Sequence, residues 1–397
     1  MRRGAVAFAF AVVATAAWAE TPLPFASGAE TRSLSSDERR VWSEADDFDR
    51  VLRRANYLYQ DRAVEAYLQR LADQLYPDLV GTIRVRLAND PMMNAFALPN
   101  GSLYINVGLV ARMENEAQLA AVMGHEGAHF VYRHSYRQRD NLKGSATAAM
   151  VLSVLGGGLA GVAGSSLAQL AVVSSVFGYS RDLEREADHV GFERMAKAGY
   201  DAKEGARSFE LLDEEAKVLE VKEPLVFATH PKLQERIDSW KELAAAQKLD
   251  GGKTEADSFT ERTAKLRSDW LQLELSRGKY KSLIYLLSKP ERAARYSSAA
   301  DYYLGEAYRL RGEPEDDQRS ESAYHRAMQR DPTFAPTYRA LGIVYYKRKQ
   351  ETLAREYLGK YLELAPDAKD AGYVKSYLQS LEPTAPAKPA SATEGKS

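Results

Sequence analysis

Residues 120–134, AAVMGHEGAHFVYRH, contain three of the six histidines of the 397-residue chain. His125 and His129 lie four residues apart, and Glu126 directly follows the first of them. Residues at i and i+4 share one face of an α-helix, so both imidazoles can reach a single point. The third histidine, His134, comes five residues after His129 and is predicted to face elsewhere, at the surface. The stretch therefore predicts a helix that carries a pair of metal ligands.

The residues around this pair indicate that the helix is mostly buried. A glutamate and two histidines would be costly in an apolar environment without a metal or other polar partners. Gly124 and Gly127 each weaken a helix by about 1 kcal/mol relative to alanine, which suggests that another segment packs closely against them. For the motif in isolation, the alternative is a solvated helix with a histidine pair.

The residue types of this motif suit hydrolysis at a zinc ion. Zn²⁺ binds N, O or S ligands at about 2.0–2.3 Å, and two neutral imidazoles meet that requirement. Zinc lowers the pKa of a coordinated water from about 16 toward about 7. Glu126 is placed to accept the proton of that water and to pass it to the leaving amine. The motif thus predicts one Zn²⁺ per chain and a general base.

A third ligand is expected from the segment SRDLEREADHVG, residues 180–191. Glu184 and Asp188 are again four residues apart on one helical face. Glu184 would complete the ligand set and leave the fourth position for water, and Asp188 could accept the N–H of a ligand histidine and fix its tautomer. Glu186 is predicted to point away. The alternative is an exposed, charged helix with a ladder from Arg181 through Glu184 to Asp188.

The pattern along the chain predicts a mainly helical fold with a small sheet. A helical pattern runs from Ser36 to Pro77, TIRVRLAND alternates like a strand, and an Asn100–Gly101 turn joins two further strands. Five segments are predicted: a signal peptide (1–19), a flexible segment (20–35), a zinc metallopeptidase domain (36–250), an α-solenoid of tetratricopeptide repeats (251–382) and a disordered tail (383–397).

Two similar segments indicate the repeats. Leu304–Gly305 followed by Tyr308 recurs as Leu341–Gly342 followed by Tyr345, which is typical of tetratricopeptide repeats. The two copies are 37 residues apart, against about 34 for that repeat. His325, within this region, is predicted to be solvated.

Composition and the N-terminus suggest an exported protein. Residues 1–19 combine two arginines, an apolar run and a small-residue cleavage pattern, although an uncleaved anchor is the alternative. The chain has no cysteine, hence neither a disulfide nor a lipidation site. The net charge of −1 gives no reason to expect nucleic acid. A soluble or peripheral protein of the periplasm is predicted.

Residues 144–180 carry no charged side chain. The stretch is long enough to span a bilayer, but its glycine, serine and alanine content favours two short helices. A buried or partner-facing hairpin is predicted, with membrane contact as the alternative.

The chain resembles the HtpX and CAAX-prenyl-protease family of zinc metallopeptidases. The resemblance lies in four segments that follow one another in the order seen in that family: NAFALPNGSLYINVGLV, MGHEGAHFVYRH, SRDLEREADHVG and THPKLQERI. The resemblance implies that His125, His129 and Glu184 bind zinc, that Glu126 is the base, and that Asp188 supports the ligands. It also implies that the segment beginning Asn94, Ala95 and Phe96 is an edge strand beside the cleft. An extended substrate could add to that edge through backbone hydrogen bonds.

Two further residues have open interpretations. His230 precedes a proline, where a structural turn residue is common; the resemblance places it near the site, as an oxyanion stabiliser or a self-inhibiting fourth zinc ligand. Arg236 could stabilise developing negative charge, or it could be a surface arginine.

These predictions converge on a periplasmic zinc endopeptidase. Its expected substrates are misfolded or stalled exported polypeptides, including outer-membrane β-barrels. The repeats would present substrate or dock on outer-membrane assembly machinery. The alternative is a chaperone-like scaffold that holds clients and cleaves little.

Overall fold

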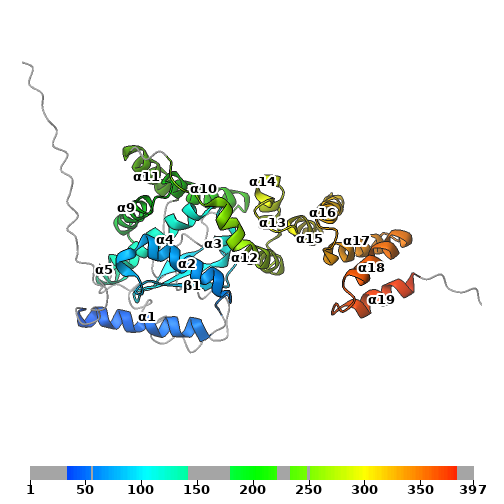
Figure 1. Cartoon of the computed structure of the whole chain (residues 1–397), viewed down its shortest axis with the longest axis horizontal. Coiled ribbons are helices and arrows are strands. Elements are labelled where there is room, and N and C mark those ends of the chain that lie inside the picture. Colours follow the sequence, from blue (N-terminus) through cyan, green and yellow to red (C-terminus); the bar gives the residue numbers. More distant parts are fainter. Residues whose placement is uncertain (1–33, 55–56, 142–178, 221–232, 248–250, 382–397) are drawn as a thin grey trace, which may run out of the picture.

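The computed structural model describes residues 34–54, 57–141, 179–220, 233–247 and 251–381. The predicted signal peptide, nearly all of residues 144–180, His230 and the C-terminal tail lie outside these ranges. The described part is mostly helical with one three-stranded sheet, which confirms the predicted class (Figure 1).

The first part of the chain contains both the sheet and the predicted metal ligands. Its elements are α1 (Ser36–Arg54), α2 (Arg62–Leu75), the 3₁₀ turn η1 (Pro77–Leu79), β1 (Arg84–Ala88), β2 (Ala95–Ala97), β3 (Ser102–Asn106), α3 (Val107–Arg112), α4 (Glu116–Val131), α5 (His134–Asn141), α9 (Arg181–Lys197), α10 (Lys203–Val218) and α11 (Leu233–Ala246).

The second part is helical throughout the described residues. Its elements are α12 (Ala256–Ser276), α13 (Tyr280–Leu287), α14 (Pro290–Ala293), α15 (Ala300–Arg311), α16 (Asp316–Arg330), α17 (Ala335–Lys347), α18 (Glu351–Leu364) and α19 (Ala371–Ser380).

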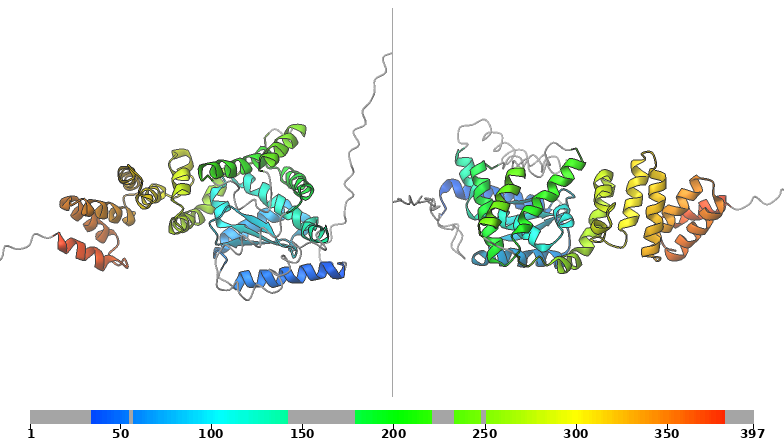
Figure 2. Two further views of the ribbon diagram at one scale, coloured as in Figure 1. Left: turned by 180° about the vertical axis from the view of Figure 1, so that it is seen from behind. Right: turned by 90° about the horizontal axis from the view of Figure 1, so that it is seen from above.

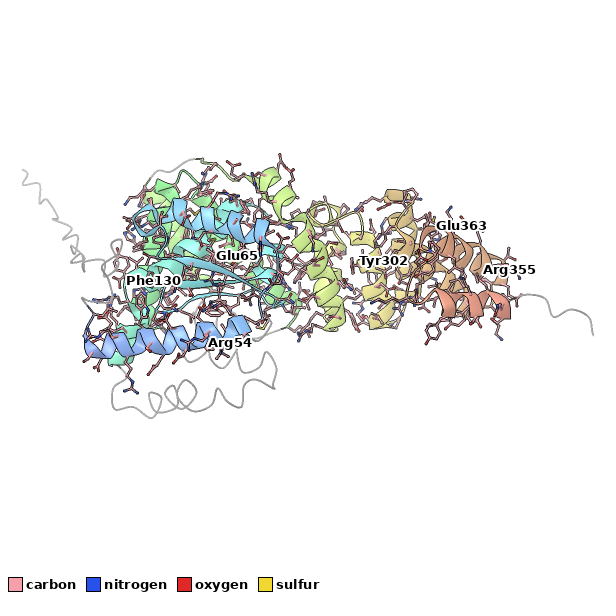
Figure 3. The ribbon with its side chains drawn as sticks, turned by 60° about the horizontal axis from the view of Figure 1, so that its bottom comes forward. Arg54, Glu65, Phe130, Tyr302, Arg355 and Glu363 are labelled. Atoms are coloured by element: carbon pink, nitrogen blue, oxygen red, sulfur yellow. The ribbon has the colours of Figure 1, made fainter. Side chains whose placement is uncertain are left out.

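The sheet has the order β1-β3-β2, with β1 parallel and β2 antiparallel to β3. Side chains of a strand alternate between its two faces. Accordingly, Leu103 and Ile105 belong to the main core, whereas Tyr104 packs with Phe48 and Leu52 of α1. Helices α1 and α2 therefore cover opposite faces, as Arg54 and Glu65 mark in Figure 3.

The turn before β3 matches the Asn100–Gly101 prediction. The side chain of Asn100 accepts a hydrogen bond from the Ser102 N–H at 3.0 Å. Gly101 has φ +84°, and a Cβ there would lie 2.6 Å from the Thr82 carbonyl oxygen, so only glycine fits.

The predicted helix over residues 36–77 is instead two helices. Between them, Leu58 forms an isolated bridge to Ala88 at the edge of the sheet. Asp61 then begins α2, because its carboxylate accepts hydrogen bonds from the N–H groups of Ala63 and Val64. Local pairing with β1 and a strong N-cap thus interrupt the helical pattern.

The region after residue 250 is tied closely to the first part. The carbonyl of Thr254 accepts hydrogen bonds from the N–H groups of Glu116 and Ala117 at the start of α4. One hydrophobic core runs from Leu34 to Ala323, and it includes side chains from both α12 and α13. The predicted boundary between residues 250 and 251 is therefore not a break in the packing.

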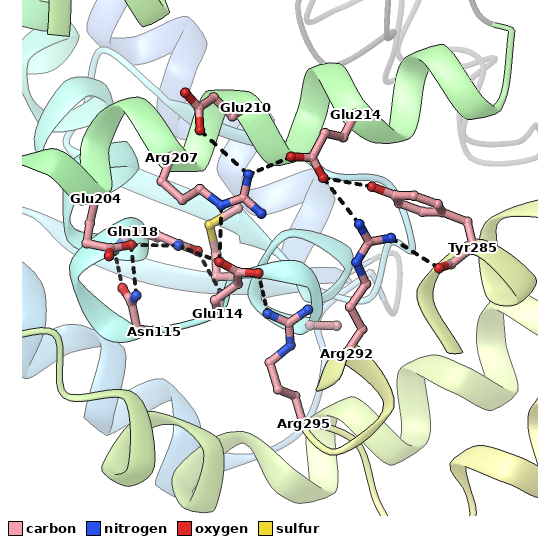
Figure 4. Close-up of polar contacts among 12 residues, drawn as sticks. Glu114, Asn115, Gln118, Glu204, Arg207, Glu210, Glu214, Tyr285, Arg292 and Arg295 are labelled. Carbon is pink, nitrogen blue, oxygen red and sulfur yellow. Dashed lines mark hydrogen bonds and ion pairs between the residues drawn. The ribbon is translucent and has the colours of Figure 1, made fainter. Parts of the chain in front are cut away.

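A polar network reinforces this junction (Figure 4). Glu114, just before α4, binds Arg295 after α14 and also Arg207 of α10. Arg207 donates to Glu214 at 2.6 Å, and Arg292 of α14 donates to the same carboxylate at 3.3 Å. The network joins three elements that are distant in sequence.

Helices α15 to α19 extend away from the rest of the molecule (Figures 1 and 2). In the pair α15/α16, Gly305 faces the ring of Tyr324; in the pair α17/α18, Gly342 faces Leu358. The two Leu-Gly segments thus occupy equivalent places in successive helix pairs. His325, which was predicted to be solvated, is partly exposed, and its Nε2 lies 3.2 Å from the Tyr345 hydroxyl.

Among the described residues, no helix combines the length and the apolar character needed to cross a membrane.

Candidate metal centre

The predicted ligands converge between α4 and α9. His125, His129 and Glu184 offer ligand atoms that all lie within 4.8 Å of one another, and all three side chains are buried. The Nε2 atoms of the histidines are 3.0 Å apart, and Glu184 oxygens lie 3.5 Å from Nε2 of His125 and 3.6 Å from Nε2 of His129.

These separations suit one small cation. Ligand atoms about 2.0–2.2 Å from a tetrahedral ion are about 3.3–3.6 Å from each other. The measured separations of 3.0–3.6 Å lie close to that range. Two imidazoles and one carboxylate are also a ligand set that zinc prefers, with a fourth position left for water.

Close helix packing produces this convergence. A Cβ on Gly124 of α4 would lie 3.0 Å from the carbonyl oxygen of Gly191 of α9, and a Cβ on Gly191 would lie 2.8 Å from the His125 nitrogen. A Cβ on Gly127 would overlap the ring of Tyr76 at 2.3 Å. The sequence expectation that something packs against both glycines of α4 is therefore met.

Asp188 and Arg236 support His125 from behind. Asp188 Oδ1 lies 2.9 Å from Nδ1 of His125, and Arg236 donates to the same oxygen at 2.7 Å. Arg236 Nη2 also lies 2.9 Å from Nδ1 of His125, and its guanidinium stacks over Phe209. Arg236 is only 4% exposed. The interpretation of Arg236 as a surface residue was wrong, because its side chain is buried and donates a hydrogen bond to Asp188.

The charges of Asp188, Arg236 and Glu184 shift the pKa values of Asp188 and His125. Burial raises the pKa of Asp188, but the Arg236 charge and the hydrogen bond with His125 outweigh it and hold this pKa at about 2. Burial and Arg236 lower the pKa of His125, whereas Asp188 and Glu184 raise it more strongly, to about 9. Because a metal ligand must be the neutral imidazole, cation binding here would release a proton.

His129 has a different environment, which sequence reasoning missed. Its Nδ1 lies 2.8 Å from Nδ1 of His134, and Tyr179 stacks on its ring with centroids 3.9 Å apart. His134 is fully buried, so its prediction as a surface residue was wrong. The reason is that α4 ends at Val131, and Arg133 adopts φ +59°, so His134 does not continue the helical path of α4.

Glu186 is not among the clustered ligand atoms, but it is buried rather than exposed. Its Oε2 lies 3.3 Å from Nε2 of His134 and accepts a hydrogen bond from Arg137 at 2.7 Å. The interpretation of α9 as an exposed charged helix was therefore wrong for Glu184, Glu186 and Asp188, which are all buried.

Glu126 is buried on α4 directly beside His125. Burial is the main cause of the raised pKa of the Tyr179 hydroxyl, and the negative charge of Glu126 adds to it. The charge of Glu126 also acts on Arg236. Glu126 is thus close to the residues that surround the cluster.

Asn94, Ala95 and Phe96 lie at or in the edge strand β2, as predicted. Asn94 accepts a hydrogen bond from the Asn106 N–H at 3.0 Å, and Phe96 stacks on Tyr104. Strand β2 has β3 as its one neighbour in the described sheet, and it packs against α4. Strand β2 therefore lies near the helix that carries the histidines.

A cavity of about 840 Å³ lies between α9 and α11. Glu184 and Asp188 line it together with the three arginines Arg181, Arg185 and Arg236. The cluster thus adjoins a space large enough for a peptide side chain.

Comparison with known proteins defines the class of this domain. Residues 59–244 match the model of peptidase family M48, so the chain carries an M48 peptidase domain. The matched region contains all three clustered ligands and Glu126.

The particular relatives are named as proteases, and one of them as a metalloendopeptidase. The chain is 28% identical over 221 residues to the putative beta-barrel assembly-enhancing protease of Vibrio cholerae. This match covers 53% of this chain and 45% of that protein. It is 28% identical over 202 residues to the beta-barrel assembly-enhancing protease of Escherichia coli, and this match covers 48% of this chain and 41% of that protein. It is also 30% identical over 154 residues to the mitochondrial metalloendopeptidase OMA1 of Schizosaccharomyces pombe, and this match covers 38% of this chain and 44% of that protein. In each case the match spans less than half of the relative. These matches confirm the predicted resemblance to a metallopeptidase family.

Proposed function

We propose that this protein is a zinc-dependent endopeptidase. The observation that carries the proposal is the convergence of His125, His129 and Glu184 within 4.8 Å inside a matched M48 domain. Zinc held by these side chains would polarise the scissile carbonyl and lower the pKa of water.

The remaining groups of the site have distinct tasks in this proposal. Glu126 accepts the proton of the attacking water and delivers it to the leaving amine. Asp188 accepts a hydrogen bond from Nδ1 of His125 and so directs Nε2 of that ring toward the cluster. Arg236 donates hydrogen bonds to Asp188 and balances its charge, which favours this supporting role over stabilisation of substrate charge.

An extended polypeptide is the substrate that the edge of β2 favours. Such a chain can pair with the strand through backbone hydrogen bonds, which are tolerant of sequence. We propose misfolded or stalled exported polypeptides as clients, including outer-membrane β-barrels. The names of the bacterial relatives support this class of client.

The periplasm is the proposed location, because residues 1–19 have the features of a signal peptide. The stacked pairs α15/α16 and α17/α18 support tetratricopeptide repeats, which would dock substrate or the outer-membrane assembly machinery. For residues 144–180, nearly all outside the described residues, we propose a buried or partner-facing hairpin, with peripheral membrane contact as the alternative.

His230 lies outside the described residues, and both of its hypothetical roles are open to test. If His230 is a self-inhibiting fourth ligand, His230→Ala should increase proteolysis. If it stabilises the oxyanion, the same variant should lose activity while zinc is retained. The measurement is casein digestion together with the zinc content of each protein.

The chaperone-like scaffold is separated from the protease by Glu126→Gln in cells. The protease proposal expects this variant to bind zinc and clients without restoring function. Full restoration of function by the variant would favour the scaffold.

A further inference from the structure

A continuous hydrogen-bonded chain leads outward from the metal-ligand candidate His129. Its Nδ1 lies 2.8 Å from Nδ1 of His134. Nε2 of His134 lies 3.3 Å from Oε2 of Glu186, which also accepts a hydrogen bond from Arg137 at 2.7 Å. His134 is fully buried and Glu186 nearly so. The chain is built into the protein interior.

The proton positions in this chain follow from the use of Nε2 in the metal cluster. Nε2 of His129 is the atom that faces His125 and Glu184, so a neutral ligand imidazole carries its proton on Nδ1. That N–H can donate across 2.8 Å only if Nδ1 of His134 is an acceptor. The proton of neutral His134 must then be on Nε2, where it faces the Glu186 carboxylate.

The support of the two ligand histidines is therefore unequal. Asp188 contacts Nδ1 of His125 directly and is backed by Arg236. On the other side, His134 is inserted between His129 and the carboxylate Glu186, which is backed by Arg137. In both cases a carboxylate of α9 fixes a proton position on an imidazole.

We propose that His134 is a positioning residue that holds His129 with Nε2 directed at the metal, and that Glu186 fixes the tautomer of His134 for this task. The proposal rests on the zinc site proposed above. Tyr179 stacks on the face of the same ring with an interplanar angle of 13°, so the edge and one face of His129 are both held. Loss of such supporting partners typically weakens metal binding 10–100-fold.

Two substitutions at His134 separate positioning from packing. His134→Phe keeps an aromatic ring but removes the acceptor, and we expect zinc to bind about 10–100-fold more weakly. His134→Asn can place an amide oxygen where Nδ1 was, and we expect its zinc affinity to stay within a few-fold of the unsubstituted protein. His189→Asn is the matched control, because His189 is an exposed histidine on α9 that pairs with Glu193.

The measurement is the zinc dissociation constant of the full chain by competition with a chelator of known affinity. Unchanged affinity in His134→Phe, or equal losses in His134→Phe and His134→Asn, would overturn the inference. If the unsubstituted protein binds no zinc, the proposed function itself fails, which is a distinct result.

Nuclear magnetic resonance of the zinc-loaded protein gives a second test that needs no variant to fold. With ¹⁵N-labelled histidine, only six imidazoles contribute signals. We expect His134 to carry its proton on Nε2 and His129 to carry its proton on Nδ1. A proton on Nδ1 of His134 would contradict the proposal.

Discussion

At the scale of single residues, Glu126 is the group on which hydrolysis depends. It is buried beside His125, and its charge acts on Tyr179 and Arg236. We expect Glu126→Gln to reduce the rate of peptide cleavage by about 10²–10⁴-fold, because a general base contributes that much. Zinc content should be unchanged.

The control for this variant is Glu193→Gln, which alters a partly exposed acid on α9. Casein digestion by both proteins, with zinc analysis of the same samples, makes the comparison. Near-normal cleavage by Glu126→Gln would remove Glu126 from the mechanism.

The sequence predicted the clustered ligands and the contact of Asp188 with His125, but not the contact of His134 with His129. The i, i+4 spacing of His125 and His129 is enough to place both on one face, and the same spacing relates Glu184 to Asp188. His134 was misplaced because its helical position was extrapolated past the end of α4. A left-handed backbone conformation at a non-glycine residue such as Arg133 has no clear signal in sequence. A third histidine soon after the metal motif was the available clue.

At the scale of elements, the crossing of α4 and α9 determines whether the ligands meet. We expect Gly191→Ala to destabilise the protein by about 1–3 kcal/mol, because its methyl group would press on the backbone of α4 at His125. Zinc binding should weaken together with stability, since the two helices would be forced apart.

The matched control is Gly359→Ala on α18, where a Cβ would meet no atom within 4 Å. That variant should be up to about 1 kcal/mol more stable, because alanine is the better helix former. Denaturant unfolding measures both changes. Equal effects of the two substitutions would mean that close contact of the helices is unimportant.

Patterns along the sequence predicted these elements more reliably than their boundaries. The alternation in TIRVRLAND and the Asn100–Gly101 turn correspond to β1 and to the connection before β3. The helical pattern over residues 36–77 missed the interruption between α1 and α2, because the bridge from Leu58 to Ala88 depends on a partner far along the chain.

At the scale of the whole molecule, buried ion pairs join the M48 domain to the helices that follow it. Arg112 of α3 donates to Glu215 of α10 at 2.6 Å and to Glu274 of α12 at 3.0 Å, and all three are buried. Removing one partner of a buried pair leaves an uncompensated charge. We therefore expect Arg112→Ala to cost about 3–5 kcal/mol of unfolding free energy.

An exposed pair provides the comparison. Exposed Arg319 of α16 pairs with exposed Glu315, which directly precedes that helix, and Arg319→Ala should cost less than about 1 kcal/mol. Similar losses for both variants in urea unfolding would indicate that the junction does not depend on Arg112. Composition alone could not predict this junction, because the contacts form between segments more than 100 residues apart.

The proposed peptide hydrolysis requires zinc held by His125, His129 and Glu184, and the decisive measurement is the metal content of Glu184→Ala. We expect about one zinc per chain in the unsubstituted protein and in the control Glu193→Ala, with casein cleavage that a chelator abolishes. Glu184→Ala should lose both zinc and cleavage. Full zinc occupancy with normal, chelator-sensitive cleavage in Glu184→Ala would contradict the role of Glu184 as a zinc ligand.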